Sequence, residues 1–416
     1  MNASFLSSPL RFYGKLGFSA LAAAALASAI TMGCTSKEKP TEVVSSPAPP
    51  APQAWAGKMQ ELSQTLSELM PLIVSKSKFN NEKNYEKIET QTRKLRTLSH
   101  SLKMGEKPGA DPGLNVMTGL FDEDISRALA SLGSGNREYA RQVLRDTTSY
   151  CVQCHTQTNN GPEFPHLNLS LNTNELNALE QAEFFAATRQ FDKSLDAFET
   201  ALTDEKLAKA DPFEWEQSAR SALAITVRVK KDPKQTSELL TKLEKLKSLP
   251  PASKEAIAAW KKSVQEWSKE KRPAPKTREE ALTRAETLIK TAQKRQEFPL
   301  DHSQDISYFR ASSLIHDLLL EKERPKDFSA RAYYWAGVAT EATRDMSFWT
   351  LHEAYYEQCI RILPHTKQAE QCFAKLKDSV TLGYSGSGGI KIPPEISQRL
   401  ETFRVLATAE APKANK

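Results

Sequence analysis

Hydrophobic residues recur at intervals of three and four along most of this chain, which is the spacing of amphipathic helices. Four such periods come first, at 55–77, at 82–103, from 111–112 through 129, and from 136 to 155. Short polar links separate them. Four amphipathic helices joined in this way predict an antiparallel bundle over residues 55–160. The last helix ends in the sequence CVQCH, residues 151–155.

The same periodicity continues after a predicted linker at 161–173, so the expected fold class is all-α. Further helices are predicted in pairs over 174–410. The predicted pairs are 212–230 with 233–247, 252–270 with 277–295, 304–321 with 327–342, and 347–362 with 365–380. The glycine-rich stretch YSGSGGIKIPPE at 384–395 is predicted to be a plain loop, since it lacks the lysine and threonine that end a phosphate-binding loop.

One stretch, ALEQAEFFAATRQFDKSLDAFETAL, resembles a tetratricopeptide repeat. Small and aromatic residues stand where that repeat places them: Ala182, Phe185, Phe191, Ser194, Phe198 and Ala201. A second, weaker match spans Tyr333, Tyr334, Tyr355 and Tyr356. The resemblance implies a degenerate solenoid of helical hairpins over 174–410 that docks a partner protein. The alternative is a helical domain without repeats.

The N-terminus carries the features of an export signal. Arg11 and Lys15 precede the apolar, alanine-rich segment 16–33, which favours a signal peptide over a membrane anchor. The sequence ITMGC at its end resembles the lipobox of bacterial lipoproteins, although Thr31 stands where that family usually has leucine. The resemblance implies that residues 1–33 are removed and that Cys34 is lipidated. The alternative is ordinary signal peptidase cleavage, which leaves Cys34 unmodified.

The segment 34–54 is polar and rich in proline, which predicts an extended tether. Thr35 follows the cysteine in place of the aspartate associated with inner-membrane retention. The expected location is therefore the periplasm, with a lipid anchor in the outer membrane rather than the inner membrane.

The sequence CVQCH has the C-x-x-C-H spacing of c-type haem attachment. In such sites two thiols, here Cys151 and Cys154, bond covalently to the haem, and the histidine, here His155, is an axial ligand of the iron. A zinc site would need two more ligands, and the chain has no second C-x-x-C. A thioredoxin-like site would need a βαβ setting, whereas the flanks are helical. The expected cofactor is one covalently bound haem c.

A haem motif at the end of a four-helix segment resembles the class II cytochromes c, the cytochrome c-prime family, over residues 55–160. The stretch ELMPLIVSKSKFNNEKNYEKIETQTRKLRTLS is also similar to that family's first two helices. The resemblance implies that a side chain of the first helix covers the haem face opposite His155. In some relatives it is a methionine that binds iron, and in others a leucine or an aromatic residue leaves the iron five-coordinate. One departure is the neutral sequence TQTNN after the motif, where the family usually has basic residues.

The candidates on the first helix are Met59, Leu62 and Leu66, of which only Met59 can bind iron. The alternative role of Met59 is core packing, to which a flexible thioether is well suited. Met70 is expected to lie too far along the helix to reach the haem. His100 and His166 are expected to be surface residues.

Cys359 and Cys372 fall on consecutive predicted helices at similar distances from a turn near residues 364–365. An antiparallel hairpin would bring them together, so a disulfide is predicted for an oxidising compartment. The alternative is two free buried thiols.

The net charge of +6 on 416 residues gives no indication of nucleic-acid binding. The expected function is one-electron transfer by a membrane-anchored periplasmic cytochrome whose helical repeats bind a redox or envelope protein. Two alternatives are a five-coordinate haem that binds nitric oxide or carbon monoxide, and an envelope scaffold lipoprotein with an accessory haem. Enzymatic activity is not expected, because a second C-x-x-C-H, as in di-haem peroxidases, and a serine–histidine–acid pattern are both missing from the sequence.

Overall fold

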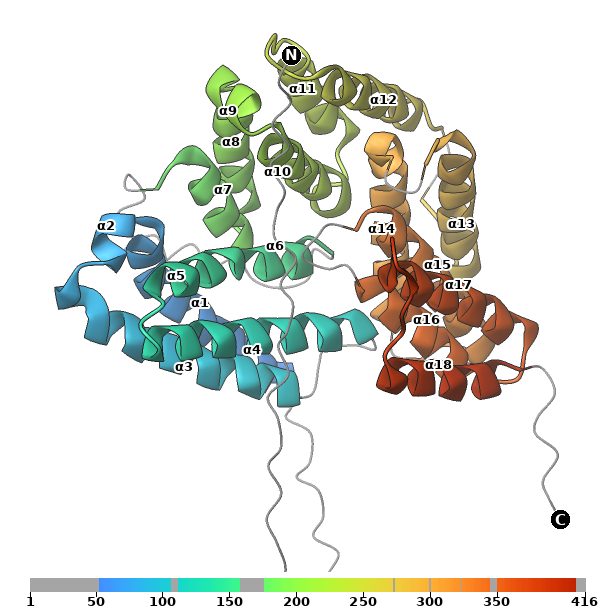
Figure 1. Ribbon diagram of the computed structural model, residues 1–416. Coiled ribbons are helices and arrows are strands. Elements are labelled where there is room, and N and C mark those ends of the chain that lie inside the picture. Colours follow the sequence, from blue (N-terminus) through green and yellow to red (C-terminus); the bar gives the residue numbers. More distant parts are fainter. Residues whose placement is uncertain are drawn as a thin grey trace, which may run out of the picture. The chain divides into compact units, whose positions relative to one another are not determined.

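The computed structural model describes residues 52–105, 111–157, 176–271, 274–298, 301–321, 323–344 and 350–408. This part of the chain is helical apart from one two-stranded hairpin, which confirms the all-α prediction (Figure 1). The predicted signal peptide with Cys34, most of the tether, and the linker with His166 lie outside the described residues. The described residues belong to one compact unit.

The helices around the motif are α1 (Pro52–Val74), α2 (Lys76–Phe79), η1 (Glu82–Asn84), α3 (Tyr85–Met104), α4 (Pro112–Gly133), α5 (Arg137–Asp146) and α6 (Thr148–Gln157). Helix α3 packs between α1 and α4, and α5 packs on α4. The carboxylate of Asp111 accepts a hydrogen bond from the Gly113 amide over 2.8 Å, so α4 begins where the Asp-Pro signal predicts.

The prediction of a single helix from residue 136 into the motif was wrong, because α5 ends before Thr147 and α6 begins after it. The hydroxyls of Thr147 and Thr148 donate hydrogen bonds to the carbonyls of Leu144 and Arg145 over 2.6 and 2.9 Å. Such bonds from threonine to the preceding turn compete with regular helix geometry. Because of this break, α6 is a separate helix that begins at Thr148.

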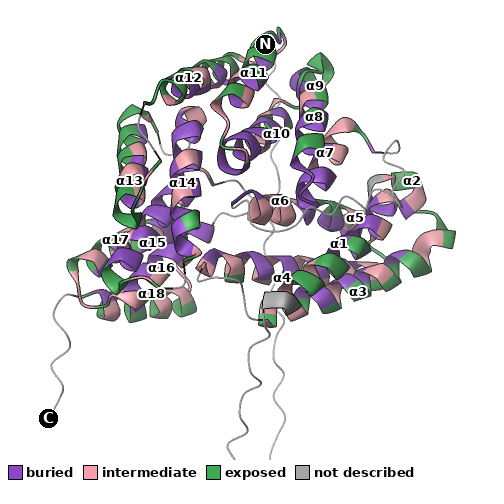
Figure 2. Cartoon of the chain, turned by 180° about the vertical axis from the view of Figure 1, so that it is seen from behind, coloured by how far each residue is buried: buried purple, intermediate pink, exposed green. Residues whose placement is uncertain are grey.

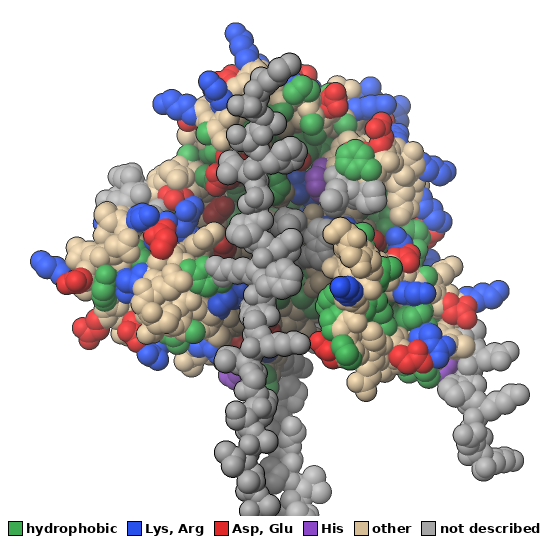
Figure 3. Space-filling model, viewed as in Figure 1, with side chains coloured by type: hydrophobic (Ala, Val, Ile, Leu, Met, Phe, Trp, Pro, Cys, Tyr) green, Lys and Arg blue, Asp and Glu red, His purple; other side chains and the backbone are tan. Residues whose placement is uncertain are grey.

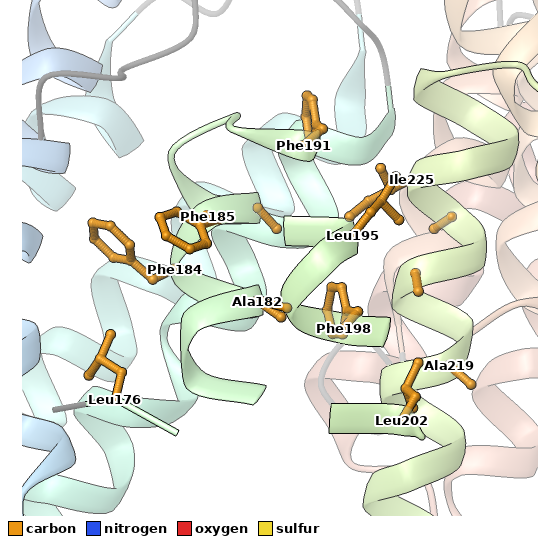
Figure 4. Packing of buried hydrophobic residues seen from close by; sticks show 14 of the residues in the cluster. Leu176, Ala182, Phe184, Phe185, Phe191, Leu195, Phe198, Leu202, Ala219 and Ile225 are labelled. Carbon is orange, nitrogen blue, oxygen red and sulfur yellow. The ribbon is translucent and has the colours of Figure 1, made fainter. Parts of the chain in front are cut away.

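The remaining helices are α7 (Ala178–Ala187), α8 (Phe191–Leu202), α9 (Glu205–Ala210), α10 (Pro212–Ala224), the π-helical η4 (Ile225–Val229), α11 (Pro233–Leu243), α12 (Pro251–Ser268), α13 (Arg278–Arg295), η5 (His302–Gln304), α14 (Asp305–Leu319), α15 (Lys326–Ala342), α16 (Leu351–Ile362), α17 (Lys367–Gly383) and α18 (Pro394–Ala407). Helices α7 and α8 pack closely, with Ala182 of α7 beside Phe198 of α8 (Figure 4). Leu195 of α8 points toward Ile225 of η4.

The predicted helices exist, but one predicted pair was wrong and one is present only in part. Helix α13 packs on α14, whereas the sequence pattern paired 277–295 with 252–270. Helix α11 packs mainly on α12, and its predicted contact with 212–230 is made through η4. The predicted contacts of α14 with α15 and of α16 with α17 are present. Periodicity locates a helix and its apolar face, but it does not determine which neighbour covers that face.

Two local features complete the C-terminal part. The predicted plain loop contains a short antiparallel hairpin of β1 (Ser385–Gly386) and β2 (Gly389–Ile390), with Gly389 in the left-handed region at φ 89°. Cys359 of α16 and Cys372 of α17 form a disulfide with 6.3 Å between their Cα atoms.

Buried residues occur on most of the helices (Figure 2). The buried hydrophobic residues form two clusters. The first extends from α1 to α14 and the second from α4 to α18. Tyr150 of α6 packs against both clusters, Cys151 against the first and Cys154 against the second. The motif helix therefore lies where the two cores meet. On the face drawn in Figure 3, acidic and basic side chains are interspersed around the periphery.

Candidate functional site

Helix α6 presents Cys151, Cys154 and His155 on one face, because residues three and four apart lie on the same side of a helix. All three line one pocket with about 760 Å³ of empty space, part of which is open to solvent. The cysteines and the histidine that the sequence singles out thus share a cavity.

The wall of this pocket is almost wholly apolar. Met59, Leu62 and Leu66 of α1 line it together with the motif, so the structure brings all six predicted haem-site residues to one place. The other large apolar residues of the wall come from α1, α3, α4 and α7: Trp55, Met70, Leu102, Leu114, Met117, Phe121 and Phe184.

Two methionines of this wall were not expected. Met70, which was expected to pack in the core too far along α1 to reach the haem, is buried in the core and also lines the pocket, because the pocket follows α1 from Trp55 to Met70. Met117 of α4 lines it too and is almost fully buried. In the sequence both methionines look like core residues. The helical period shows which residues face inward, but it does not distinguish residues that line a pocket from residues that fill a core. His100, by contrast, has a side chain that is 56% exposed and lies 3.7 Å from Asp122.

The two cysteines are separate thiols in this structure. Burial raises the pKa of Cys151 to about 12, and burial together with the nearby carboxylate of Asp111 raises that of Cys154 to about 12. The thiols are therefore protonated at neutral pH. Neutral thiols resist metal binding and oxidation, which require the thiolate.

His155 is held in its neutral form. Burial, aided by the positive charge of Arg189, lowers the pKa of His155 to about 4, while the carbonyls of Ala186 and Ala187 oppose the shift. Its Nδ1 atom is buried and has no hydrogen-bond partner. A neutral imidazole with an uncommitted nitrogen is the form of histidine that binds a metal.

Arg189 anchors the end of the motif helix. Its Nη1 donates a hydrogen bond to the His155 carbonyl over 3.3 Å, and the side chain is 4% exposed. A cation at a helix C-terminus also interacts favourably with the helix dipole. Arg189 stands in the turn between α7 and α8 at φ 58°, and no pattern in the sequence indicates its role.

Tyr150 and Glu183 flank the site. The Tyr150 hydroxyl donates a hydrogen bond to Asp124 over 2.6 Å, and its ring lies edge-on to Phe121. Thr148, the first residue of α6, donates a hydrogen bond to the carboxylate of Glu183 over 3.4 Å. Burial raises the pKa of Glu183 to about 7. A carboxyl group that titrates near neutral pH therefore lies at the start of the motif helix.

The residues present fit a covalently bound haem. Two thiols and a neutral imidazole with an unpartnered nitrogen face one apolar pocket, which is the donor set and lining that a covalent haem requires. Within the described ranges, no group of three or more histidine, cysteine, aspartate and glutamate side chains is arranged to hold a metal ion. Among the described helices, none is long and apolar enough to cross a membrane.

No protein family model, curated protein or solved structure matches this chain.

Proposed function

We propose that this protein is a monohaem c-type cytochrome that transfers single electrons. The observation that carries the proposal is that one apolar pocket is lined both by Cys151, Cys154 and His155 and by the first-helix residues Met59 and Leu62. This is the arrangement that the resemblance to class II cytochromes c implies. On this view α1, α3, α4 and the α5–α6 pair are a four-helix bundle of that family.

Each residue of the site then has a defined task. Cys151 and Cys154 would attach the haem through thioether bonds, and His155 would bind the iron. The haem, when bound, supplies the one-electron couple. The apolar wall excludes water, and the Arg189 hydrogen bond fixes the end of the helix that carries His155. Exclusion of water favours the reduced, less charged form of a haem.

The residue opposite His155 determines which chemistry is available. Met59 is the first candidate for a sixth ligand, because the family resemblance places a methionine of the first helix there. Met70 and Met117 line the same pocket and are further candidates. If Leu62 or Leu66 covers the iron instead, the open position would bind nitric oxide or carbon monoxide.

The proposal extends to the rest of the chain. Residues 174–410 would be a degenerate tetratricopeptide-like scaffold that docks a redox or envelope protein. The close packing of α7 on α8 through Ala182 and Phe198 supports this view. Lipidation of Cys34 would tether the protein to the outer membrane on its periplasmic side. The scaffold alternative is that the repeats assemble an envelope complex and the haem is accessory.

The test is the absorption spectrum of the full chain, produced in a host that attaches haem c in its periplasm. A Soret band that survives acid–acetone extraction is expected for the wild type and for the disulfide variant C359A/C372A. It should be lost in C151A/C154A. The same loss of absorbance in the wild type would refute haem attachment.

The ferrous spectrum with and without carbon monoxide separates the two haem functions. Sharp α and β bands that carbon monoxide does not move would mean a sixth protein ligand and an electron carrier. A high-spin spectrum that shifts on addition of carbon monoxide would mean an open iron and a gas-binding role. The scaffold alternative predicts that C151A/C154A still co-purifies with the partner of the wild type.

A further inference from the structure

A second cavity lies on the opposite face of α6. It has about 390 Å³ of empty space and is lined by Val152, Gln153 and Thr156 of that helix. These residues point away from Cys151, Cys154 and His155, which line the apolar pocket. The far side of the cavity is formed by α10, η4, Phe309 of α14 and Thr343. Its lining is mostly polar, in contrast to the first pocket.

Arg228 lines this cavity as a buried cation. It is 3% exposed, and its guanidinium lies 4.6 Å from the centre of the Phe309 ring. Its Nε atom is buried without a hydrogen-bond partner, and no side-chain hydrogen bond or ion pair of Arg228 is found among the described residues. Arg228 belongs to the π-helical turn η4, a local geometry that is rare and frequently occurs at functional sites.

Asp305 attracts the positive charge of Arg228, but this carboxylate is already paired with a second arginine. Arg220 also lines the cavity, but its Nε donates to the carboxylate of Asp305 over 2.6 Å, and its Nη2 donates to the Thr343 carbonyl over 2.9 Å. Asp305 is therefore already paired with Arg220, and His302 lies 3.5 Å from its second oxygen. The hydroxyl of Tyr355 is neutral, because burial raises its pKa well above the usual value. Among the described residues, the two arginines therefore share one carboxylate, which leaves one positive charge uncompensated.

A buried charge without a partner is strongly unfavourable, and proteins compensate such a charge with an ion pair or a bound ion. The cavity offers further donors beside the guanidinium. Gln217 accepts a hydrogen bond from Arg220 through Oε1, which leaves its NH₂ group to donate. Gln153 supplies a second side-chain amide from α6. The arrangement suits an acceptor that has several oxygen atoms and one negative charge.

We propose that this cavity binds a small planar oxyanion with a single negative charge, a carboxylate or nitrate ion, with Arg228 as its counter-charge. The planar guanidinium donates two parallel hydrogen bonds to the two oxygens of such an ion. A single charge matches the one uncompensated arginine. The site is separate from the haem pocket and does not depend on haem attachment.

The experiment is calorimetric titration of the full chain with sodium formate and, separately, with sodium nitrate, at constant ionic strength set with chloride. Saturable binding of one ion per chain is expected for at least one of the two salts. Arg228→Met, which keeps the apolar stem and removes the charge, should weaken binding at least tenfold. The matched control is Arg361→Met, since Arg361 also lies 4.6 Å from a phenylalanine ring, that of Phe403, but is 55% exposed.

Wild-type affinity in Arg228→Met would overturn the proposal, and so would the absence of saturable binding of both salts to the wild type. If Arg228→Met does not fold, Arg228→Lys provides the test. Lysine keeps the charge but cannot form the two parallel bonds, so binding should weaken at least threefold while the control remains unchanged. Unchanged binding in Arg228→Lys would then refute the role of the guanidinium.

Discussion

The Arg189 guanidinium donates a hydrogen bond to the carbonyl oxygen of His155, with 3.3 Å between the two atoms. The two residues are far apart in the chain, and a stretch that includes the predicted linker 161–173 separates them. The bond joins the turn between α7 and α8 to the last turn of the motif helix. A residue of the repeat-like region thus holds the predicted iron ligand in place, so the two predicted domains share one site.

Replacing Arg189 by methionine should lower the free energy of unfolding by about 1–3 kcal/mol, because a buried hydrogen bond to a charged group is lost. The loss of its positive charge should also raise the pKa of His155, since Arg189 now lowers it. Urea denaturation measures the first effect, and imidazole NMR of the haem-free C151A/C154A background measures the second. An exposed arginine provides the control: R93M removes a surface pair with Glu89 and should cost less than about 0.5 kcal/mol.

The three pocket methionines can be separated by leucine substitution, which conserves volume and costs less than about 1.5 kcal/mol in a core. If Met59 is the sixth ligand, M59L should convert a low-spin ferrous spectrum to a high-spin one that responds to carbon monoxide. M70L and M117L should keep the wild-type spectrum. A high-spin spectrum in either of these two variants alone would assign the ligand to that methionine instead.

Glu183 should make stability depend on pH. Burial raises the pKa of Glu183 from its usual value of 4.5 to about 7 in the folded chain, so the folded state keeps a proton that the unfolded state has already lost. Between these two pH values the free energy of unfolding therefore falls as pH rises. The loss should reach about 1–3 kcal/mol at pH 8.

Denaturation of wild type and E183Q at pH 5, 6, 7 and 8 measures this effect. The glutamine variant should show a flatter profile and be the more stable chain at pH 8. The exposed variant E61Q should follow the wild-type profile. If E183Q and wild type have the same pH profile, Glu183 does not titrate in the folded state as described.

Much of the candidate site could be predicted from local spacing. Cys151, Cys154 and His155 lie on one helical face because their separations of three and four residues require it. Met59, Leu62 and Leu66 follow from the apolar period of the first helix. Arg189 could not be found in this way, because its role depends on a turn that the chain brings to α6 from a distant position.

In the fold, too, the features that depend on neighbouring residues could be predicted, and the contacts between distant segments could not. Each predicted helix has a counterpart, because amphipathic periods and caps such as Asp111 act within a few residues. The partners of α12 and α13 and the main partner of α11 were predicted wrongly, since several apolar faces compete for each neighbour. The break at Thr147 was missed because a threonine in a helical period gives no sign of which carbonyl its hydroxyl will bond.

The disulfide between Cys359 and Cys372 should contribute to stability mainly by restricting the unfolded chain. The two cysteines are separated by 13 residues, and closing a loop of this length is worth about 3 kcal/mol in the chain-entropy treatment. C359A/C372A should therefore unfold at lower urea concentration than the wild type. Treatment of the wild type with a reductant should reproduce the change, whereas reductant should leave the double variant unaffected. Equal stability of the two chains would show that the loop is already ordered when the chain is unfolded.

Gly337 sets the distance between α15 and α16. A Cβ atom at this position would lie 2.7 Å from Cδ1 of Tyr356, well inside van der Waals contact. The ring cannot easily move, because Tyr356 is fully buried and its hydroxyl donates a hydrogen bond to Glu341 over 2.6 Å. Alanine favours helices over glycine by about 1 kcal/mol, but this gain is smaller than the overpacking expected here.

G337A should therefore lower the free energy of unfolding by about 1–3 kcal/mol, as measured by urea denaturation. The matched control is G119A on α4, where an added Cβ meets no atom within 4 Å, and which should raise stability by about 0.5–1 kcal/mol. The cost of G337A should shrink in a Y356A background, because the two positions are coupled only through the ring. If G337A stabilises the chain as G119A does, α15 and α16 do not lie this close together at Gly337.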